Sequence, residues 1–379
     1  MHLTGVELRM LSLHLRSAHA SASGEETVRP VVLVRVLTAS GDGWGECAAL
    51  GAPTYSPEYA TAAWEVLRSD LVPRLLSGDT SPASAGDVGG LLADVRGHHM
   101  AKAALEMAVL DAELRAAGRP LAAHLGVAVP SVPAGAVAGL APSAGALVER
   151  VEALVAEGYG RVKVKIAPGR EVGPLSAVRA RFPDLVLQAD ANGAYRLEDP
   201  DDVAALAALD GLGLACIEQP LAADDLVGHA ALARRIRTRI CLDESITSLG
   251  RLEAARALGA LEVACVKAGP LGGLLTAVVA HDRCLEAGLD AWCGGMLETG
   301  LGRAANAALA GLPGFTLAGD VAGGPRFVEE DPFGAPEMAD GRVLLHRGPG
   351  IAPAPDPAAL AAATTRVELL APGGSAGGR

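Results

Sequence analysis

Aromatic residues, excess positive charge and long apolar runs are all absent or scarce in this chain of 379 residues. Only 3% of the residues are aromatic, which leaves few side chains for stacking on nucleic-acid bases or for a membrane-interface belt. Lys and Arg number 32 against 44 Asp and Glu, so the net charge of -12 disfavours phosphate-rich partners. No apolar run approaches the roughly 18 residues of a membrane span. We therefore predict neither a nucleic-acid nor a membrane partner.

Paired cysteines are also absent, because the six cysteines form no CxxC motif and most of them lie inside apolar runs. This pattern is typical of buried free thiols rather than of a disulfide framework. Free thiols persist in a reducing compartment, so the sequence predicts a cytoplasmic protein. Half of the residues are hydrophobic, which is enough apolar material for a large folded core.

From residue 131 onward, short apolar runs alternate with Ala- and Leu-rich helical stretches. Such alternation is typical of repeated βα units with a parallel sheet. Polar residues end the middle runs at nearly constant spacing, which favours a closed TIM-type barrel. An open doubly wound sheet is the alternative, but no G-x-G-x-x-G motif follows a strand. The expected strands are 132–139, 161–166, 185–190, 215–218, 240–243, 263–267, 290–293 and 316–318.

The regions on either side of this repeat have a different pattern. Alternating runs at 3–16 and 31–38 flank an expected polar loop at 17–29, and helical stretches follow at 57–76 and 100–117, which predicts an α+β domain. Residues 342–346 are expected to form a strand that returns to this first domain, and the chain end from 372 onward is expected to be disordered. The predicted domains are a cap over 1–126, a barrel over 127–320, and a C-terminal segment over 321–379 that returns to the cap.

Three acidic residues, Asp190, Glu218 and Asp243, each end an apolar, strand-like run. In a barrel the C-terminal ends of the strands face one mouth, so these carboxylates should converge there. Converging carboxylates repel one another unless a cation lies between them, and an all-oxygen ligand set suits Mg²⁺. Each acid alone could instead cap the helix that follows it. Three acids at the barrel spacing favour the metal site.

Lys163 and Lys165 lie on one expected strand, whose two-residue period points both side chains to the same side. Lys267 ends another apolar run, nearly opposite around the expected barrel. Lysines inside a barrel need charged partners, and the carboxylates with their metal would supply them. The cation of Lys163 and the metal would then lower the pKa of Lys165 toward the range of a general base. For Lys163 and Lys165 taken alone, a half-solvated edge strand is the alternative interpretation.

The motifs around these residues resemble the enolase superfamily, and within it the branch of o-succinylbenzoate synthases and N-acylamino acid racemases. The resemblance covers nearly the whole chain and includes the sequences Gly-Trp-Gly-Glu-Cys at 43–47 and Tyr-Ser-Pro-Glu-Tyr at 55–59. The remaining motifs are Lys163-Val164-Lys165, Asp190-Ala191-Asn192, Ile217-Glu218-Gln219-Pro220, Leu242-Asp243-Glu244-Ser245, Val266-Lys267 and Gly-Gly-Met-Leu-Glu-Thr-Gly at 294–300.

The resemblance implies a modified TIM barrel, (β/α)7β, under an α+β capping domain, and removal of a proton α to a carboxylate through an enediolate. In the synthases Lys165 would take the proton while Lys267 stays charged, whereas in the racemases both lysines would exchange protons. The implied assignments are Asp190, Glu218 and Asp243 as ligands of Mg²⁺ (or Mn²⁺), Lys165 and Lys267 as the acid/base pair, Lys163, Asn192, Met296 and Glu298 as substrate contacts, and Glu244 as an acid supporting the ligands.

The segments that would set specificity depart from the family pattern. Residues 18–23 contain no aromatic residue and no arginine, and Ala268-Gly269-Pro270 follows Lys267 where the family has Pro-Gly-Arg. The second change removes a cation beside Lys267 and disfavours the racemase. We therefore predict an o-succinylbenzoate synthase, a lyase of menaquinone biosynthesis acting on a small carboxylate, as a homo-oligomer. N-acylamino acid racemisation, or action on another carboxylate substrate, is the alternative. A non-catalytic barrel is disfavoured because it would need none of these acids and lysines. A metal hydrolase is disfavoured because it would need histidine ligands.

Overall fold

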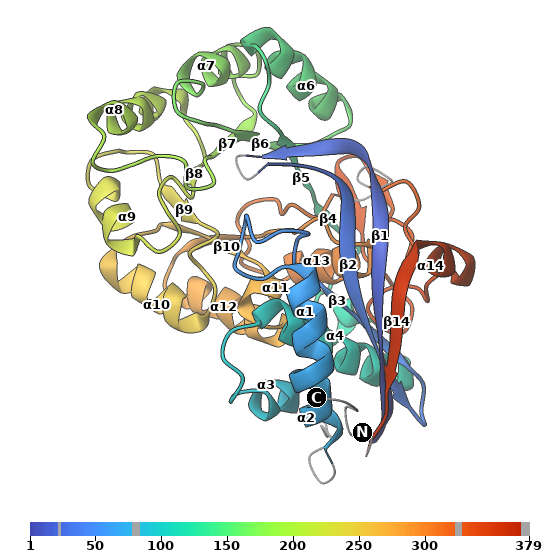
Figure 1. Cartoon of the computed structure of the whole chain (residues 1–379). Coiled ribbons are helices and arrows are strands. Elements are labelled where there is room, and N and C mark those ends of the chain that lie inside the picture. The colour runs from blue at the N-terminus through green and yellow to red at the C-terminus, as the bar shows by residue number, and fades with distance from the viewer. Residues whose placement is uncertain (22–23, 78–83, 323–327, 373–379) are drawn as a thin grey trace.

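The computed structural model describes residues 1–21, 24–77, 84–322 and 328–372 (Figure 1). The tip of the expected polar loop, at 22–23, and the expected disordered tail, at 373–379, lie outside these residues. Within the described ranges, every helix is too short or too polar to span a bilayer.

A curved parallel sheet of seven strands holds the predicted site. The strands follow the order of the chain around the sheet, as expected for successive βα units. This arrangement confirms the predicted barrel and excludes the doubly wound sheet. The strands are β5 (Gly135–Ala138), β6 (Arg161–Lys165), β7 (Val186–Asp190), β8 (Ile217–Glu218), β9 (Ile240–Leu242), β10 (Val263–Val266) and β11 (Asp290–Cys293).

The expected eighth strand at 316–318 does not form a regular strand, yet the segment 316–320 still joins the two ends of the sheet. The backbone N–H of Thr316 donates to the carbonyl oxygen of Ala291 on β11, at 2.9 Å. On the other side, the N–H of Gly135 on β5 donates to the carbonyl oxygen of Gly319, at 2.7 Å. The N–H of Asp320 also donates to the carbonyl oxygen of Cys293 on β11, at 2.9 Å, so scattered bonds on both sides close the ring without making a regular ladder.

Helices follow the barrel strands and surround them (Figure 1). Several begin where the sequence offers a capping residue: the side chains of Ser143, Asp199, Asp225, Ser248 and Thr299 each accept a backbone N–H of the first turn. The helices are α6 (Ala144–Ala156), α7 (Val172–Arg181), α8 (Pro200–Ala208), the 3₁₀ turn η3 (Leu209–Leu212), α9 (Leu226–Ala233), α10 (Leu249–Leu258), α11 (Ala268–Leu271), α12 (Leu274–Glu286) and α13 (Gly300–Ala310).

The cap is an antiparallel sheet in the order β14-β1-β2-β3, packed against the helix α4 (His99–Ala116). Gly43 and Gly45 permit this close packing, because a Cβ at either position would overlap the backbone of α4. The strands are β1 (Leu3–Ser21), β2 (Gly24–Thr38), β3 (Gly43–Cys47) and β14 (Thr364–Leu370). The other helices are α1 (Ala60–Val66), the π-helical η1 (Leu67–Leu71), α2 (Val72–Leu76), α3 (Ala85–Leu91), α5 (Leu121–His124) and α14 (Pro357–Ala363).

Two expectations for the cap are wrong. The segment at 17–29 was expected to be a loop, but its described residues, 17–21 and 24–29, belong to β1 and β2, which pair as far as Ser21 and Gly24 (Figure 1). Strand pairing uses backbone groups, so polar side chains do not prevent it. The second error concerns 342–346: β13 (Arg342–Leu344) does form, but it pairs with β4 (Ser131–Pro133) and β12 (Met338–Ala339). The strand that pairs with β1 is β14. The exact domain boundaries stay a prediction.

Candidate active site and metal centre

The parallel register brings the predicted acids and lysines together at the C-terminal ends of the strands. Lys165 of β6 pairs with Asp190 of β7, and Asp190 pairs with Glu218 of β8. Glu218 pairs in turn with Cys241 of β9, so Asp243, two residues further along, lies on the same side of the sheet. The convergence expected from the strand spacing is therefore present in the fold.

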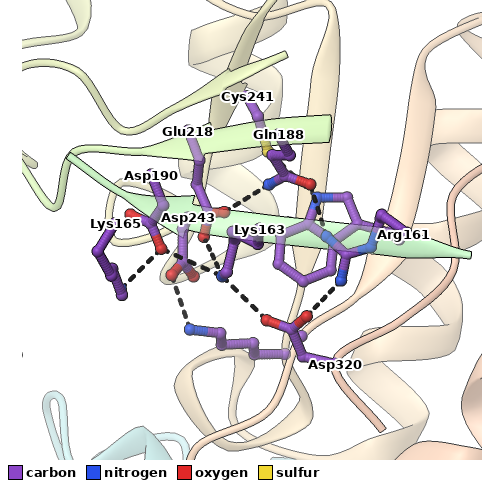
Figure 2. A network of polar contacts seen from close by, with 12 residues as sticks. Arg161, Lys163, Lys165, Gln188, Asp190, Glu218, Cys241, Asp243 and Asp320 are labelled. Carbon is purple, nitrogen blue, oxygen red and sulfur yellow. Dashed lines mark hydrogen bonds and ion pairs between the residues drawn. The ribbon is translucent and has the colours of Figure 1, made fainter. Parts of the chain in front are cut away.

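Lys163 lies at the centre of the acids (Figure 2). Its Nζ is 3.2 Å from Asp190 Oδ2, 3.1 Å from Glu218 Oε1 and 2.9 Å from Asp320 Oδ2. The same ammonium lies 4.7 Å from the ring centroid of Trp292. Burial lowers the pKa of Lys163, but the carboxylates of Asp320, Glu218 and Asp190 together raise it well above the usual value. Lys163 therefore remains a cation that holds three carboxylates within reach of one another.

Lys165 faces the same mouth and joins two predicted site residues. Its Nζ donates to Asp190 Oδ2 at 2.7 Å and to Asn192 Oδ1 at 2.5 Å. Asn192 adopts a left-handed backbone conformation with φ of 44° and donates from Nδ2 to Glu244 Oε1 at 2.8 Å. Asn192 thus connects the amine to Glu244, and its strained backbone lies at the candidate site, where such conformations concentrate.

Lys267 approaches from the far side of the ring, directly after β10. Its Nζ donates to Asp243 Oδ2 and to the hydroxyl of Tyr55, both at 2.7 Å. The Tyr55 hydroxyl in turn donates to Asp243 Oδ2 at 3.0 Å, and the amine lies 4.7 Å from the centroid of its ring. Burial lowers the pKa of Lys267, but Asp243 and other nearby acids raise it well above the usual value. Tyr55 belongs to the cap, so the cap directly contacts the mouth of the barrel.

Negative charge at the mouth is only partly compensated by the lysines. Burial and then Asp190 raise the pKa of Glu218 well above its usual value. For Glu244, burial followed by Asp243 and Asp190 raises the pKa to about 7, and its Oε2 is buried with no hydrogen-bond partner among the described residues. For Asp190, burial acts in the same direction, but Lys165 and Lys163 outweigh it and lower the pKa.

These carboxylates fit a divalent cation. Glu218 and Asp243 each place an oxygen within 4.8 Å of the other, and Asp190 neighbours Glu218 across the ladder. Burial raises the pKa of Glu218 and of Glu244, and Glu244 keeps one buried oxygen without a partner among the described residues, so a cation placed between these acids would be stabilised. The residues therefore form a candidate centre for a divalent metal.

Arg161 and Gln188, which were not predicted as site residues, also support the site. Gln188 Nε2 donates to Glu218 Oε2 at 2.5 Å, and Arg161 donates to Gln188 Oε1 at 2.6 Å. Arg161 also forms an ion pair with Asp320 (Figure 2). The two-residue period of a strand could have identified both, because Arg161 shares a side with Lys163 and Gln188 shares one with Asp190.

Gln219 orients Asp243 from the neighbouring strand end. Its Oε1 accepts the backbone N–H groups of Asp243 at 3.1 Å and Ser245 at 3.2 Å, and its Nε2 donates to Ser245 Oγ at 2.8 Å. Gln219 has a positive φ of 40°, so another strained residue directly follows a predicted ligand. Tyr55 lies in one of the motifs that resemble the superfamily, but no local pattern indicated that Tyr55 would contact Lys267 or that Asp320 would contact Lys163.

Met296 and Glu298 lie in the loop after β11. Glu298 Oε2 accepts the backbone N–H of Met296 at 2.8 Å, and its Oε1 accepts from Asn306 Nδ2 on α13 at 2.9 Å. Among the described residues, the hydrogen bonds of the Glu298 side chain thus stay within its own loop and the following helix. The substrate contacts expected from both residues stay a prediction.

A capped barrel with carboxylates and amines converging at its mouth is the arrangement of a class of metal-dependent enzymes that act on small molecules. Two family models match this chain: "Mandelate racemase / muconate lactonizing enzyme, N-terminal domain" over residues 6–126 and "Enolase C-terminal domain-like" over residues 146–359. The chain therefore belongs to the enolase superfamily, and the fold and the resemblance expected from its motifs are confirmed.

Individual relatives cover almost the whole chain. It is 48% identical over 366 residues to an N-succinylamino acid racemase of Amycolatopsis sp, with 96% of this chain and 98% of the relative covered. It is 42% identical over 350 residues to an o-succinylbenzoate synthase of Geobacillus kaustophilus, with 91% and 92% covered. A solved enolase-superfamily member from Listeria innocua superposes with a TM-score of 0.94 at 34% identity, covering 98% of this chain and 99% of that one. Both predicted reactions are thus represented among similar proteins.

Proposed function

We propose that this protein is an o-succinylbenzoate synthase, which removes a proton α to a carboxylate and expels a hydroxyl group as water, with Mg²⁺ (or Mn²⁺) as cofactor. One observation carries the proposal. Lys165 on β6 and Lys267 after β10 lie four strand positions apart around the ring, with three acids on the strands between them. A substrate carbon placed between the two amines would be reached from opposite sides.

The metal would be held by Asp190, Glu218 and Asp243, and it would supply Lewis-acid stabilisation of the charge that develops on the substrate carboxylate. Lys165 would take the α-proton with its lone pair, and the resulting ammonium could return a proton to the departing hydroxyl, so that water leaves and charge is conserved. Lys163 and Asn192, which flank Lys165, would position the substrate carboxylate.

The contacts of Lys267 support a cationic role opposite the base. Asp243 accepts from its ammonium, and the hydroxyl and ring of Tyr55 hold it in place. A fixed cation on this side would stabilise the enediolate without taking part in proton transfer. Dehydration needs no more than this from Lys267.

Racemisation of N-succinylamino acids is the second candidate. Its support is the 48% identity to a racemase and the placement of a second amine on the face opposite Lys165. In that reaction, Lys165 and Lys267 would each give and take a proton at the same carbon.

Incubation with the hydroxylated cyclohexadiene carboxylate precursor, and separately with N-succinylamino acids in D₂O, distinguishes the candidates. We expect dehydration without deuterium at the amino acid α-carbon, whereas exchange with inversion and no dehydration would establish the racemase. Lys267→Arg sharpens the test, because arginine keeps the charge but cannot transfer a proton at neutral pH. This variant should retain measurable dehydration and lose any exchange. Absence of both reactions in the wild type would refute both assignments.

We also propose a cytoplasmic, homo-oligomeric protein with domains at 1–126, 127–320 and 321–379. All six cysteines are free and buried, which supports a reducing compartment. Val367 and Leu369 are exposed on β14, an edge strand, and such apolar positions suit contact between copies. Analytical ultracentrifugation tests the assembly, and a single monomeric species at micromolar concentration would contradict it.

A further inference from the structure

Cys265 lies beside the proposed metal ligands. Val263 of β10 pairs with Cys241 of β9, so Cys265 and Asp243, each two residues further along its strand, face the same side at the same level. The Sγ of Cys265 and one oxygen each of Glu218 and Asp243 all lie within 4.8 Å of one another. A small closing movement of these side chains would bring all three donors to one ion.

The thiol is buried and directed toward these acids. Cys265 is 1% exposed, and within the described part of the chain its Sγ takes part in no hydrogen bond. Gly294 on the neighbouring segment leaves room for it, since a Cβ there would lie 2.5 Å from this Sγ and 2.6 Å from Cε of Lys267. The packing thus keeps the thiol next to the carboxylates and available as a donor.

The residues offer two ligand sets that differ in chemical softness. Asp190, Glu218 and Asp243 are oxygen donors, which suit Mg²⁺ and Mn²⁺. Glu218, Asp243 and Cys265 combine two oxygens with a thiolate, which suits Zn²⁺, Cd²⁺ or Co²⁺. Because the two sets share Glu218 and Asp243, one ion excludes the other.

We propose that a thiophilic divalent cation binds to Glu218, Asp243 and Cys265 in a mode that excludes the activating metal. This inference rests on the metal centre of the proposed function. On binding, the S–H bond of Cys265 breaks, a sulfur–metal bond forms, and the proton passes to solvent, with no change of oxidation state. The ion would compete with Lys267 for Asp243, at the side of the mouth away from Lys165. Zn²⁺ and Cd²⁺ would therefore inhibit the enzyme.

Titration of the metal-free full-length protein with Cd²⁺ tests the proposal directly. We expect an ultraviolet sulfur-to-cadmium charge-transfer band that saturates at about one equivalent. Cys265→Ser should abolish the band and weaken Cd²⁺ binding at least about tenfold, while Mg²⁺ affinity measured by calorimetry stays within about twofold. Cys284→Ser, which changes another buried thiol on α12, is the matched control and should keep both the band and the affinity.

Each result has a distinct meaning. A band that is missing in the wild type, or that survives in Cys265→Ser and disappears in Cys241→Ser, would overturn the inference. Mg²⁺ binding without any thiolate band would refute the inference and leave the proposed function intact. A Cys265-dependent band without Mg²⁺ binding would support the thiolate site and refute the proposed function. Circular dichroism checks folding, and Cys265→Ala provides a second variant if the serine variant is unstable.

Discussion

Glu106 offers a sharp test of how burial controls charge at the boundary between cap and barrel. It lies on α4 in the cap and is 5% exposed. Its Oε1 accepts the backbone N–H of Leu275, at the start of barrel helix α12, at 3.0 Å. Gly273 precedes this helix, and a Cβ there would overlap the Glu106 carboxyl group. The perturbation is Glu106→Gln, which keeps the shape and an acceptor oxygen but removes the charge.

Burial raises the pKa of Glu106 from 4.5 to about 7, although the N–H groups of Leu275 and Leu274 act in the opposite direction. As the pH rises, the unfolded chain loses this proton first, so between about 4.5 and 7 the native state binds more protons. The free energy of unfolding of the wild type therefore falls across this window, by about 3 kcal/mol in full. The glutamine variant does not titrate. Its stability advantage should grow by about 2 kcal/mol between about pH 5 and about pH 8.

Urea unfolding of both proteins at the two pH values, followed by tryptophan fluorescence, measures this advantage. Glu149→Gln on α6 is the control, because it removes the same charge from an exposed position that burial does not affect. A stability difference for Glu106→Gln that stays constant, or that reverses in favour of the wild type at the higher pH, would refute the reasoning. The ionised carboxylate would then be stabilised by α12 more than burial opposes it.

Three further outcomes follow from the packing and the site. Gly300→Ala should lower the free energy of unfolding, measured by denaturation, by about 1–3 kcal/mol, because its Cβ would overlap the carbonyl oxygen of Gly334. Gly250→Ala, on an open face of α10, is the control and should raise the free energy of unfolding by about 0.5–1 kcal/mol in the same assay. Lys165→Ala should lower kcat by about 10²–10⁴-fold in steady-state kinetics while circular dichroism stays unchanged, and near-wild-type turnover would exclude it as the base. Asp190→Asn should weaken Mg²⁺ binding at least about tenfold by calorimetry, and an unchanged affinity would remove it from the ligand set.

Local periodicity explains why much of the barrel and its site could be predicted. Strand and helix positions follow from short runs of apolar residues and from capping residues such as Ser143 and Ser248, which act within one turn. Lys163 and Lys165 could be predicted to share one side of β6, because the two-residue period of a strand alone sets the side to which each side chain points. Among the barrel strands, the prediction was wrong for the eighth, because the segment 316–320 closes the ring through scattered hydrogen bonds and not through a regular ladder.

Regular spacing along the chain becomes regular position around a ring, so the barrel and the convergence of Asp190, Glu218 and Asp243 could be inferred before the fold was known. The superfamily followed from the resemblance of the motifs around these residues. Tertiary structure alone decided which groups meet these acids from elsewhere. Tyr55 reaches Lys267 across 212 positions of sequence, and Asp320 joins Lys163 from beyond the last barrel strand. Such contacts depend on how the cap docks and how the ring closes, and no short pattern in the chain encodes either.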